Sequence, residues 1–211
     1  MKLIGMLDSP FVRRVAISMQ LRELPFEHCN WSVGRDFARI RGYSPLGRVP
    51  ALVLDGGEVL TESSAVLDYL DDLVGPARAL LPLTGAPRRE SLRLMANAIG
   101  AAEKGRDQIY ERAMRPAEKV HGPWAARLES QMHGGLAQVD AAAAQRGDAW
   151  LVGAALSQVD ITVTCAASFL ADTVLPDLAV RYPHLGAHAA RCEALPPFVA
   201  TRTPFFMPGR G

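Results

Sequence analysis

Residues 48–64 read RVPALVLDGGEVLTESS, and this stretch decides the fold of the first part of the chain. Residues 49–54 are apolar enough for a buried strand, Asp55-Gly56-Gly57 is a hairpin turn, and residues 58–60 form the return strand. Pro50 cannot donate a backbone hydrogen bond to a sheet, so we expect it at the end of a strand or at a bulge, where a cis peptide bond is accommodated.

Upstream and downstream of this hairpin, strand and helix signals alternate. Residues 1–7 are an apolar strand, and Ser9-Pro10 then starts a helix, with serine as the N-cap and proline at the first helical position. Residues 26–31 form a second strand, so the chain opens with a parallel βαβ unit. With a short helix around residues 37–41 and another from about Ser63 to Leu73, the expected order is β-α-β-α-β-β-α.

The rest of the chain has almost entirely helical patterns, in residues 90–114 and from Gly122 to about Gln145. Ser157 and Asp160 form a capping box before a helix with almost no polar face, which we expect to be the core of a second domain. We therefore divide the chain into an α/β domain (residues 1–76), a linker rich in proline (77–87) and an all-α domain (88–211).

The composition excludes several classes of protein. The 211 residues include 23 basic and 22 acidic side chains, and a net charge of +1 argues against a protein held to nucleic acid by phosphate contacts. The apolar runs are too short for a membrane span or a signal peptide. Cys29, Cys165 and Cys192 show no metal-like spacing, which favours reduced thiols. We expect a cytoplasmic protein with no metal, membrane or nucleic-acid partner.

Four motifs carry a resemblance to a known family: SPFVRRV at residues 9–15, SPLGRVP at 44–50, Glu62-Ser63, and SQVD at 157–160. With these motifs in this order, nearly the whole chain resembles the glutathione S-transferases, in particular bacterial members with serine at the active position. The family often has asparagine where this chain has Ser44, and a small residue where it has Val159. The resemblance implies a thioredoxin-like N-terminal domain, a helical-bundle C-terminal domain, a homodimer and a role in detoxification.

The resemblance also implies a site for glutathione, which carries two carboxylates, one ammonium and a thiol. Glu62 and Ser63 are implied to hold its γ-glutamyl end, and free N–H groups at the start of a helix do bind carboxylates. Val49, before Pro50, is implied to pair with the cysteinyl part through its backbone. Arg48 could meet the glycyl carboxylate, or it could be an ordinary solvated arginine.

Ser9 is the residue that we expect to activate glutathione. A free thiol has a pKa of about 8.5, so only roughly 3% is thiolate at neutral pH. A hydroxyl donated to the sulfur, together with the N-terminus of the helix that begins at Pro10, would favour the thiolate. The alternative is that Ser9 serves only as the N-cap. The absence of cysteine at position 9, and of any tyrosine before Tyr43, argues against the branches of the family that use those residues.

The second substrate should bind between the domains, and our candidates for its pocket are Phe11, Arg106 and Tyr110. Residues 106 and 110 lie one helical turn apart and would place a cation and a hydroxyl over the sulfur. A solvated arginine and a tyrosine at the domain interface are the alternative. The five histidines show no pattern of pairing, so we expect surface or loop positions for His28, His121, His133, His184 and His188.

These features predict a glutathione S-transferase that activates glutathione as a thiolate for attack on a small hydrophobic electrophile. Because the same scaffold hosts other chemistry, a glutathione-dependent isomerase or dehalogenase is the enzymatic alternative. A protein that binds glutathione or a hydrophobic ligand without catalysis is the alternative of a different class.

Overall fold

A four-stranded sheet organises the N-terminal part of the chain in the computed structural model, which describes residues 1–206. The strand order is β2-β1-β3-β4. The strands are β1 (Lys2–Ile4), β2 (Glu27–Cys29), β3 (Ala51–Val53) and β4 (Val59–Thr61). β1 runs parallel to β2 and antiparallel to β3, and β3 and β4 form the predicted antiparallel hairpin with Leu52 opposite Leu60. The peptide bond between Val49 and Pro50 is cis, as expected.

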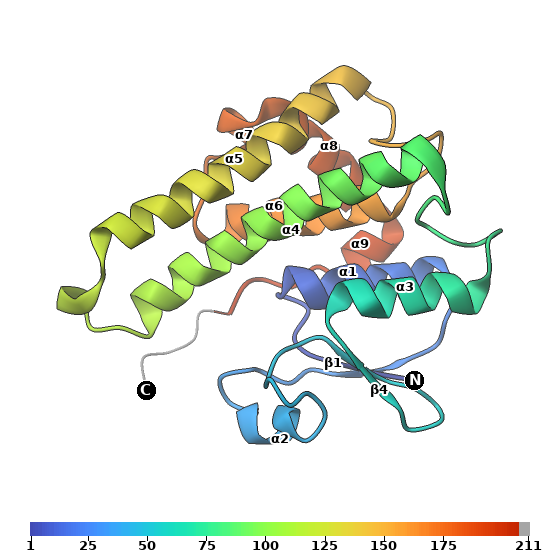
Figure 1. The fold of residues 1–211 in the computed structure, drawn as a ribbon, viewed down its shortest axis with the longest axis horizontal. Helices are drawn as coiled ribbons and strands as arrows, with labels where there is room; N and C mark the ends of the chain where they lie inside the picture. The colour runs from blue at the N-terminus through green and yellow to red at the C-terminus, as the bar shows by residue number, and fades with distance from the viewer. Residues whose placement is uncertain (207–211) are drawn as a thin grey trace.

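Helices cover both faces of this sheet. Figure 1 shows α1 (Pro10–Leu21) and α3 (Ser63–Val74) side by side between the sheet and the helical part of the chain, with α2 (Phe37–Arg41) on the opposite side of the sheet. Leu3 packs with the cluster under α1 and α3, whereas its neighbour Ile4 packs with Ile40 of α2. Successive residues of a strand face opposite sides of the sheet, which explains why Leu3 and Ile4 are both apolar and buried, whereas Lys2 at the end of the strand is exposed. The order β-α-β-α-β-β-α is confirmed.

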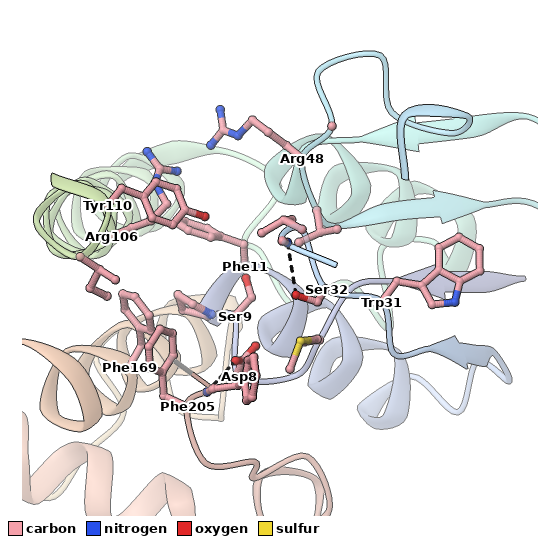
Figure 2. A pocket seen from close by; sticks show the side chains of 18 of the residues that line it. Asp8, Ser9, Phe11, Trp31, Ser32, Arg48, Arg106, Tyr110, Phe169 and Phe205 are labelled. Carbon is pink, nitrogen blue, oxygen red and sulfur yellow. Dashed lines mark hydrogen bonds between the residues drawn. The ribbon is translucent and has the colours of Figure 1, made fainter. Parts of the chain in front are cut away.

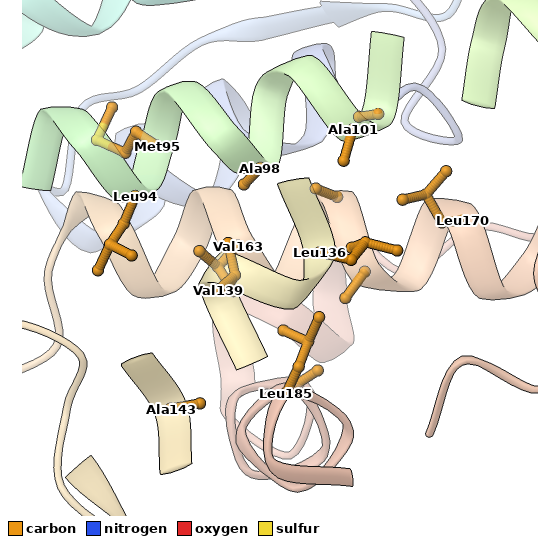
Figure 3. Packing of buried hydrophobic residues seen from close by; sticks show 14 of the residues in the cluster. Leu94, Met95, Ala98, Ala101, Leu136, Val139, Ala143, Val163, Leu170 and Leu185 are labelled. Atoms are coloured by element: carbon orange, nitrogen blue, oxygen red, sulfur yellow. The ribbon is translucent and has the colours of Figure 1, made fainter. Parts of the chain in front are cut away.

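The C-terminal part is a bundle of helices whose centre is α6. Its elements are α4 (Gly85–Ala113), a 3-10 helix (Ala117–Lys119), α5 (Gly122–Arg146), α6 (Gln158–Thr173), α7 (Leu178–Arg181), α8 (Pro183–Glu193) and α9 (Pro196–Ala200). Figure 3 shows side chains of α4, α5, α6 and α8 meeting in one apolar cluster. Gly105 lies against the Leu170 side chain, and Gly135 lies against the backbone of Asn97, so a side chain at Gly135 would separate α4 and α5. The expectation that α6 forms the core of this part is confirmed.

The predicted linker is shorter in the structure than in the sequence pattern. Helix α4 begins at Gly85, five residues before the expected start, because Pro87 lies in the first turn, where its missing N–H costs nothing. Asp71 of α3 accepts hydrogen bonds from the backbone N–H groups of Leu80 (2.8 Å) and Leu81 (3.3 Å). The backbone N–H of Gln158 donates to the carbonyl of Leu80 (2.9 Å). The connecting segment is thus tied to both parts of the molecule, while the domain boundaries remain a prediction.

No helix within residues 1–206 combines the length and the apolar character that crossing a bilayer requires.

Candidate functional site

A pocket of about 540 Å³ lies between the loop that follows β1 and the helices α4 and α6. Figure 2 shows the side chains that line it, with Ser9 near the centre and with Phe169 and Phe205 across the opening from Tyr110. Its lining is mostly apolar and aromatic, which suits a hydrophobic small molecule. All three residues predicted for the electrophile, Phe11, Arg106 and Tyr110, line this pocket.

A second, smaller pocket of about 270 Å³ adjoins the first. It is lined by five residues that the sequence assigned to glutathione: Arg48, Val49, Pro50, Glu62 and Ser63. Phe11, Arg48 and Val49 line both pockets, so they form the wall that the two pockets share. The predicted glutathione residues other than Ser9 thus line the smaller pocket, whereas Ser9 lines the larger pocket together with the predicted electrophile residues.

Ser9 is the N-cap residue of α1 by position but not by hydrogen bonding. Its backbone is extended (φ −73°, ψ 124°), and its carbonyl accepts the hydrogen bond from the Arg13 N–H (2.9 Å). Its hydroxyl, however, accepts no hydrogen bond from the first N–H groups of α1, within the part of the chain that the structure describes. Because the hydroxyl is not used as a cap and lines the larger pocket, it is available to a ligand there.

Glu62 takes a backbone conformation that is rare for residues other than glycine, with φ of +73°. In this conformation its carboxylate accepts hydrogen bonds from the Ser64 N–H (3.0 Å) and from the Ser63 hydroxyl (3.1 Å). Glu62 thus caps α3 itself, which the sequence did not predict. Its side chain is exposed and lines the smaller pocket, so the carboxylate keeps room for a further donor such as an ammonium group.

A buried arginine stands behind this glutamate. Arg14 is only 1% exposed, and its Nη2 donates to the hydroxyls of Ser63 (2.7 Å) and Ser64 (2.8 Å). Burial lowers the pKa of Arg14 to about 10, although the Glu62 carboxylate favours its charge. The cation therefore fixes both serines at the start of α3. Nothing in the sequence pattern distinguished Arg14 from the other arginines, since its role depends on α1 being enclosed on all sides.

Arg106 lines the larger pocket, but its charge is already paired. Its Nη2 and Nε donate to Asp107 Oδ1 (2.8 and 3.2 Å), and its Cζ lies 6.0 Å from the centre of the Phe11 ring. Arg48 lies 3.7 Å from the carboxylate of Glu103 on α4. Both cations thus have acidic neighbours in this structure, so a ligand carboxylate would have to share them.

The expectation for the histidines is wrong for His188, which is 1% exposed. Its Nε2 lies 3.2 Å from Asp160 Oδ1, and its Nδ1 lies 3.2 Å from the guanidinium of Arg191. Because a guanidinium can only donate, Nδ1 accepts and Nε2 donates to Asp160. His188 and Asp160 are in contact only because α8 packs against α6, and a local sequence pattern does not reveal this packing. This cluster lies outside both pockets.

The three cysteines are free thiols of unequal exposure. Burial raises the pKa of all three thiols, to about 12 for Cys165 and to about 11 for Cys192, but Cys29 alone is only half-buried. The thiolate is the form that attacks a disulfide. We expect an aromatic disulfide reagent at pH 8 to modify one thiol per folded chain, at Cys29, and all three after unfolding in urea. Rapid modification of two or more thiols in the folded protein would contradict this burial.

Among residues 1–206, no group of three or more histidine, cysteine, aspartate or glutamate side chains is arranged to hold a metal ion.

Comparisons with known proteins agree with this fold. Residues 3–78 match the family model of the glutathione S-transferase N-terminal domain, and residues 122–191 match that of the C-terminal domain. An uncharacterised GST-like protein of Escherichia coli K12, YibF, is 28% identical over 186 residues, covering 88% of this chain and 90% of its own.

Two crystal structures of similar proteins contain derivatives of glutathione. A glutathione S-transferase of Methylobacterium radiotolerans, in complex with glutathione sulfonate, is 28% identical with a TM-score of 0.86, covering 97% of both chains. A glutathione transferase family member of Pseudomonas fluorescens Pf-5, with bound S-(propanoic acid)-glutathione, is 30% identical with a TM-score of 0.79, covering 97% of this chain and all of that one. With both family models matched and this similarity along almost its whole length, the chain belongs to the glutathione S-transferase family.

Proposed function

We propose that this protein is a glutathione transferase in which Ser9 stabilises bound glutathione as a thiolate for attack on a small hydrophobic electrophile. The observation that carries the proposal is the position of the Ser9 hydroxyl. It is free of the helix cap and lines the apolar pocket, close to the wall shared with the smaller pocket. A sulfur held at that boundary would meet a serine donor on one side and an electrophile on the other.

Glutathione would lie along the smaller pocket with its γ-glutamyl end at the start of α3. There the Glu62 carboxylate would accept a hydrogen bond from the ammonium group, and the Ser63 backbone N–H would donate to the carboxylate of glutathione. Arg14 would hold Ser63 in place through its hydrogen bond to the Ser63 hydroxyl. The cysteinyl part would pair with Val49. The pairing of β1 with β3 ends at Ala51, opposite Ile4, so Val49 lies beyond the ladder. Arg48 would then be near the glycyl carboxylate.

The chemistry requires a modest change in thiol acidity. Lowering the pKa from about 8.5 by about two units makes the thiolate the major form at neutral pH, at a differential stabilisation of about 2.7 kcal/mol. One hydroxyl donated to a charged acceptor contributes about 1.5 to 3 kcal/mol. The N-terminus of α1 adds a smaller favourable contribution. Ser9 does not need to lose its own proton, so it acts as a donor to the nucleophile that glutathione supplies.

We also propose that the protein works in the cytoplasm as a homodimer, with glutathione as its co-substrate and no metal. The family membership supports the dimer, and three free thiols support a reducing compartment. A glutathione-dependent isomerase or dehalogenase would use the same thiolate on another second substrate.

Calorimetric titration with glutathione tests the proposal at its binding step. We expect one glutathione bound per chain, and an affinity at least about tenfold lower in Glu62→Gln, because the variant loses a charge-assisted hydrogen bond to the ammonium. Glu58→Gln is the matched control, since Glu58 is exposed on the hairpin and outside both pockets. The wild type failing to bind glutathione would overturn the proposed function.

A further inference from the structure

A short segment near the end of the chain crosses to the loop that carries Ser9. Residues 202–206, here called the C-terminal strap, follow α9, and Phe205 and Phe206 both line the larger pocket. No local sequence pattern indicates this contact, because the strap and the serine are almost two hundred residues apart. The strap is part of the pocket wall, and its Phe205 also packs against the apolar cluster of the C-terminal bundle.

The strap is held at both ends. At its start, Arg202 makes a bidentate ion pair with Asp172 of α6 (2.7 and 2.8 Å). Just before it, buried Arg13 of α1 donates to the carbonyl of Phe198 (2.8 Å) and forms a bidentate pair with Glu193 (2.6 Å for each bond). The position at which the strap leaves α9 is therefore fixed against α1, the helix that Ser9 precedes.

At its far end the strap is held by a hydrogen bond to Asp8, here called the latch. The Asp8 carboxylate accepts a hydrogen bond from the backbone N–H of Phe206 (3.0 Å), and Asp8 itself lines the pocket beside Ser9. The guanidinium of Arg35 lies 5.5 Å from the centre of the Phe206 ring. Burial raises the pKa of Asp8, and the hydrogen bond from Phe206 partly offsets this. A carboxylate beside the proposed thiolate would not stabilise the negative charge on the sulfur. The geometry instead supports a role for Asp8 in holding the strap.

The strap contributes an aromatic side to the pocket. The Phe205 ring packs edge-to-face on Phe169, with the ring centres 5.7 Å apart and the planes at 72°. Figure 2 shows this pair across the opening from Tyr110, with Phe11 and Ser9 nearby. Aromatic walls favour flat aromatic ligands, because stacked and edge-to-face ring contacts add to the burial of apolar surface.

We infer that the C-terminal strap selects electrophiles that carry a planar aromatic ring, with Phe205 as the specificity-determining residue and Asp8 as the positioning residue that holds the strap. This inference rests on the proposed glutathione transferase function and names its class of second substrate.

Binding of two glutathione conjugates that differ only in the group on sulfur tests the inference without requiring turnover. The probes are S-benzylglutathione and S-methylglutathione, each titrated calorimetrically into the full chain. We expect the wild type to bind the benzyl conjugate at least about tenfold more tightly. In Phe205→Ala this preference should fall by about fivefold, the equivalent of about 1 kcal/mol for one aromatic contact. The affinity for S-methylglutathione should stay within about twofold.

Three further variants separate the latch from a general effect on the fold. Asp8→Ala should reduce the preference for the benzyl conjugate by about threefold, whereas Asp8→Asn should restore it, because the carboxamide oxygen still accepts the Phe206 N–H. Val199→Ala is the control, since Val199 is exposed on α9 and outside the pocket. It should match the wild type.

Three results would count against this account, and they have different meanings. An unchanged preference for the benzyl conjugate in Phe205→Ala would refute the role of the strap while leaving the glutathione site intact. If Asp8→Asn behaved like Asp8→Ala, the charge of Asp8 and not the latch would be responsible. If the wild type bound neither conjugate, the proposed function itself would fail.

Discussion

Replacing Ser9 by alanine should lower kcat/KM for glutathione conjugation by between about tenfold and about a hundredfold at pH 7. The variant loses one hydroxyl donated to a thiolate, which is worth about 1.5 to 3 kcal/mol, and each 1.4 kcal/mol is about tenfold in rate. The affinity for glutathione should change by less than about threefold, because Glu62, Ser63 and Val49 hold the rest of the tripeptide. Steady-state kinetics at several glutathione concentrations, together with calorimetry, separate the two effects.

The stability of the same variant distinguishes activation from capping. A serine that capped α1 would cost about 0.5 to 2 kcal/mol on replacement by alanine. The Ser9 hydroxyl makes no such bond to α1 within the described residues, so the free energy of unfolding should hardly change. Ser9→Thr is the matched control, since it keeps the hydroxyl and should keep most of the activity. Normal turnover in Ser9→Ala with a clear loss of stability would support the capping alternative and contradict our account.

Replacing Asp160 by alanine should destabilise the protein by about 3 to 5 kcal/mol, more than any surface change. Asp160 is fully buried, and its carboxylate accepts from the N–H groups of Leu151 and Ser157 (2.9 Å each) and from the Ser157 hydroxyl (2.7 Å). His188 Nε2 is a fourth donor. Removing the acceptor leaves buried donors without partners at the start of the central helix of the bundle. Urea unfolding followed by circular dichroism measures the loss.

The pH dependence of this effect follows from the acidity of Asp160. Burial opposes its charge, but the hydrogen bonds from His188, Leu151 and Ser157 outweigh burial and lower its pKa below 3.8. The contribution of Asp160 to stability is therefore complete above the pKa of an unfolded aspartate, about 3.9, and is lost as the pH falls through the lower folded value. The difference between wild type and variant should shrink below about pH 4.

Two variants control the Asp160 experiment. Asp148→Ala removes a fully exposed carboxylate that lies 3.3 Å from Arg191, and such surface pairs contribute about 0 to 1 kcal/mol. If Asp160→Ala does not fold, Asp160→Asn keeps the volume and one acceptor oxygen and should show a smaller but clear loss. A loss for Asp160→Asn no larger than that for Asp148→Ala would show that the cluster does not stabilise the bundle.

The parts of the fold that depend on residues close together in the sequence could be predicted from the sequence. The hairpin, the cis bond before Pro50 and the order of elements follow from turn residues, proline chemistry and apolar periodicity. The strands are shorter than predicted: β2 spans only Glu27–Cys29 of the expected 26–31. An apolar run shows which residues prefer burial, whereas the length of a strand depends on how many of them find a partner in the sheet.

The parts of the fold and of the site that depend on distant contacts could not be predicted. Arg14 meets Ser63, His188 meets Asp160, and Asp8 meets the strap only because helices pack against one another. None of these pairs has a local signature, since each member has an ordinary role in its own segment. Arg106 lines the larger pocket, but its pairing with the adjacent Asp107 depends on rotamers that spacing does not determine.

The acidity of the bound glutathione thiol tests the central claim most directly. The ultraviolet absorbance of the thiolate, followed as the pH of the complex is raised, gives the pKa of the bound thiol. We predict a value about two units below the value of about 8.5 for a free thiol, and a return toward that value in Ser9→Ala with glutathione still bound. A bound thiol with the acidity of free glutathione would contradict activation by Ser9 and would favour a protein that binds glutathione without catalysis.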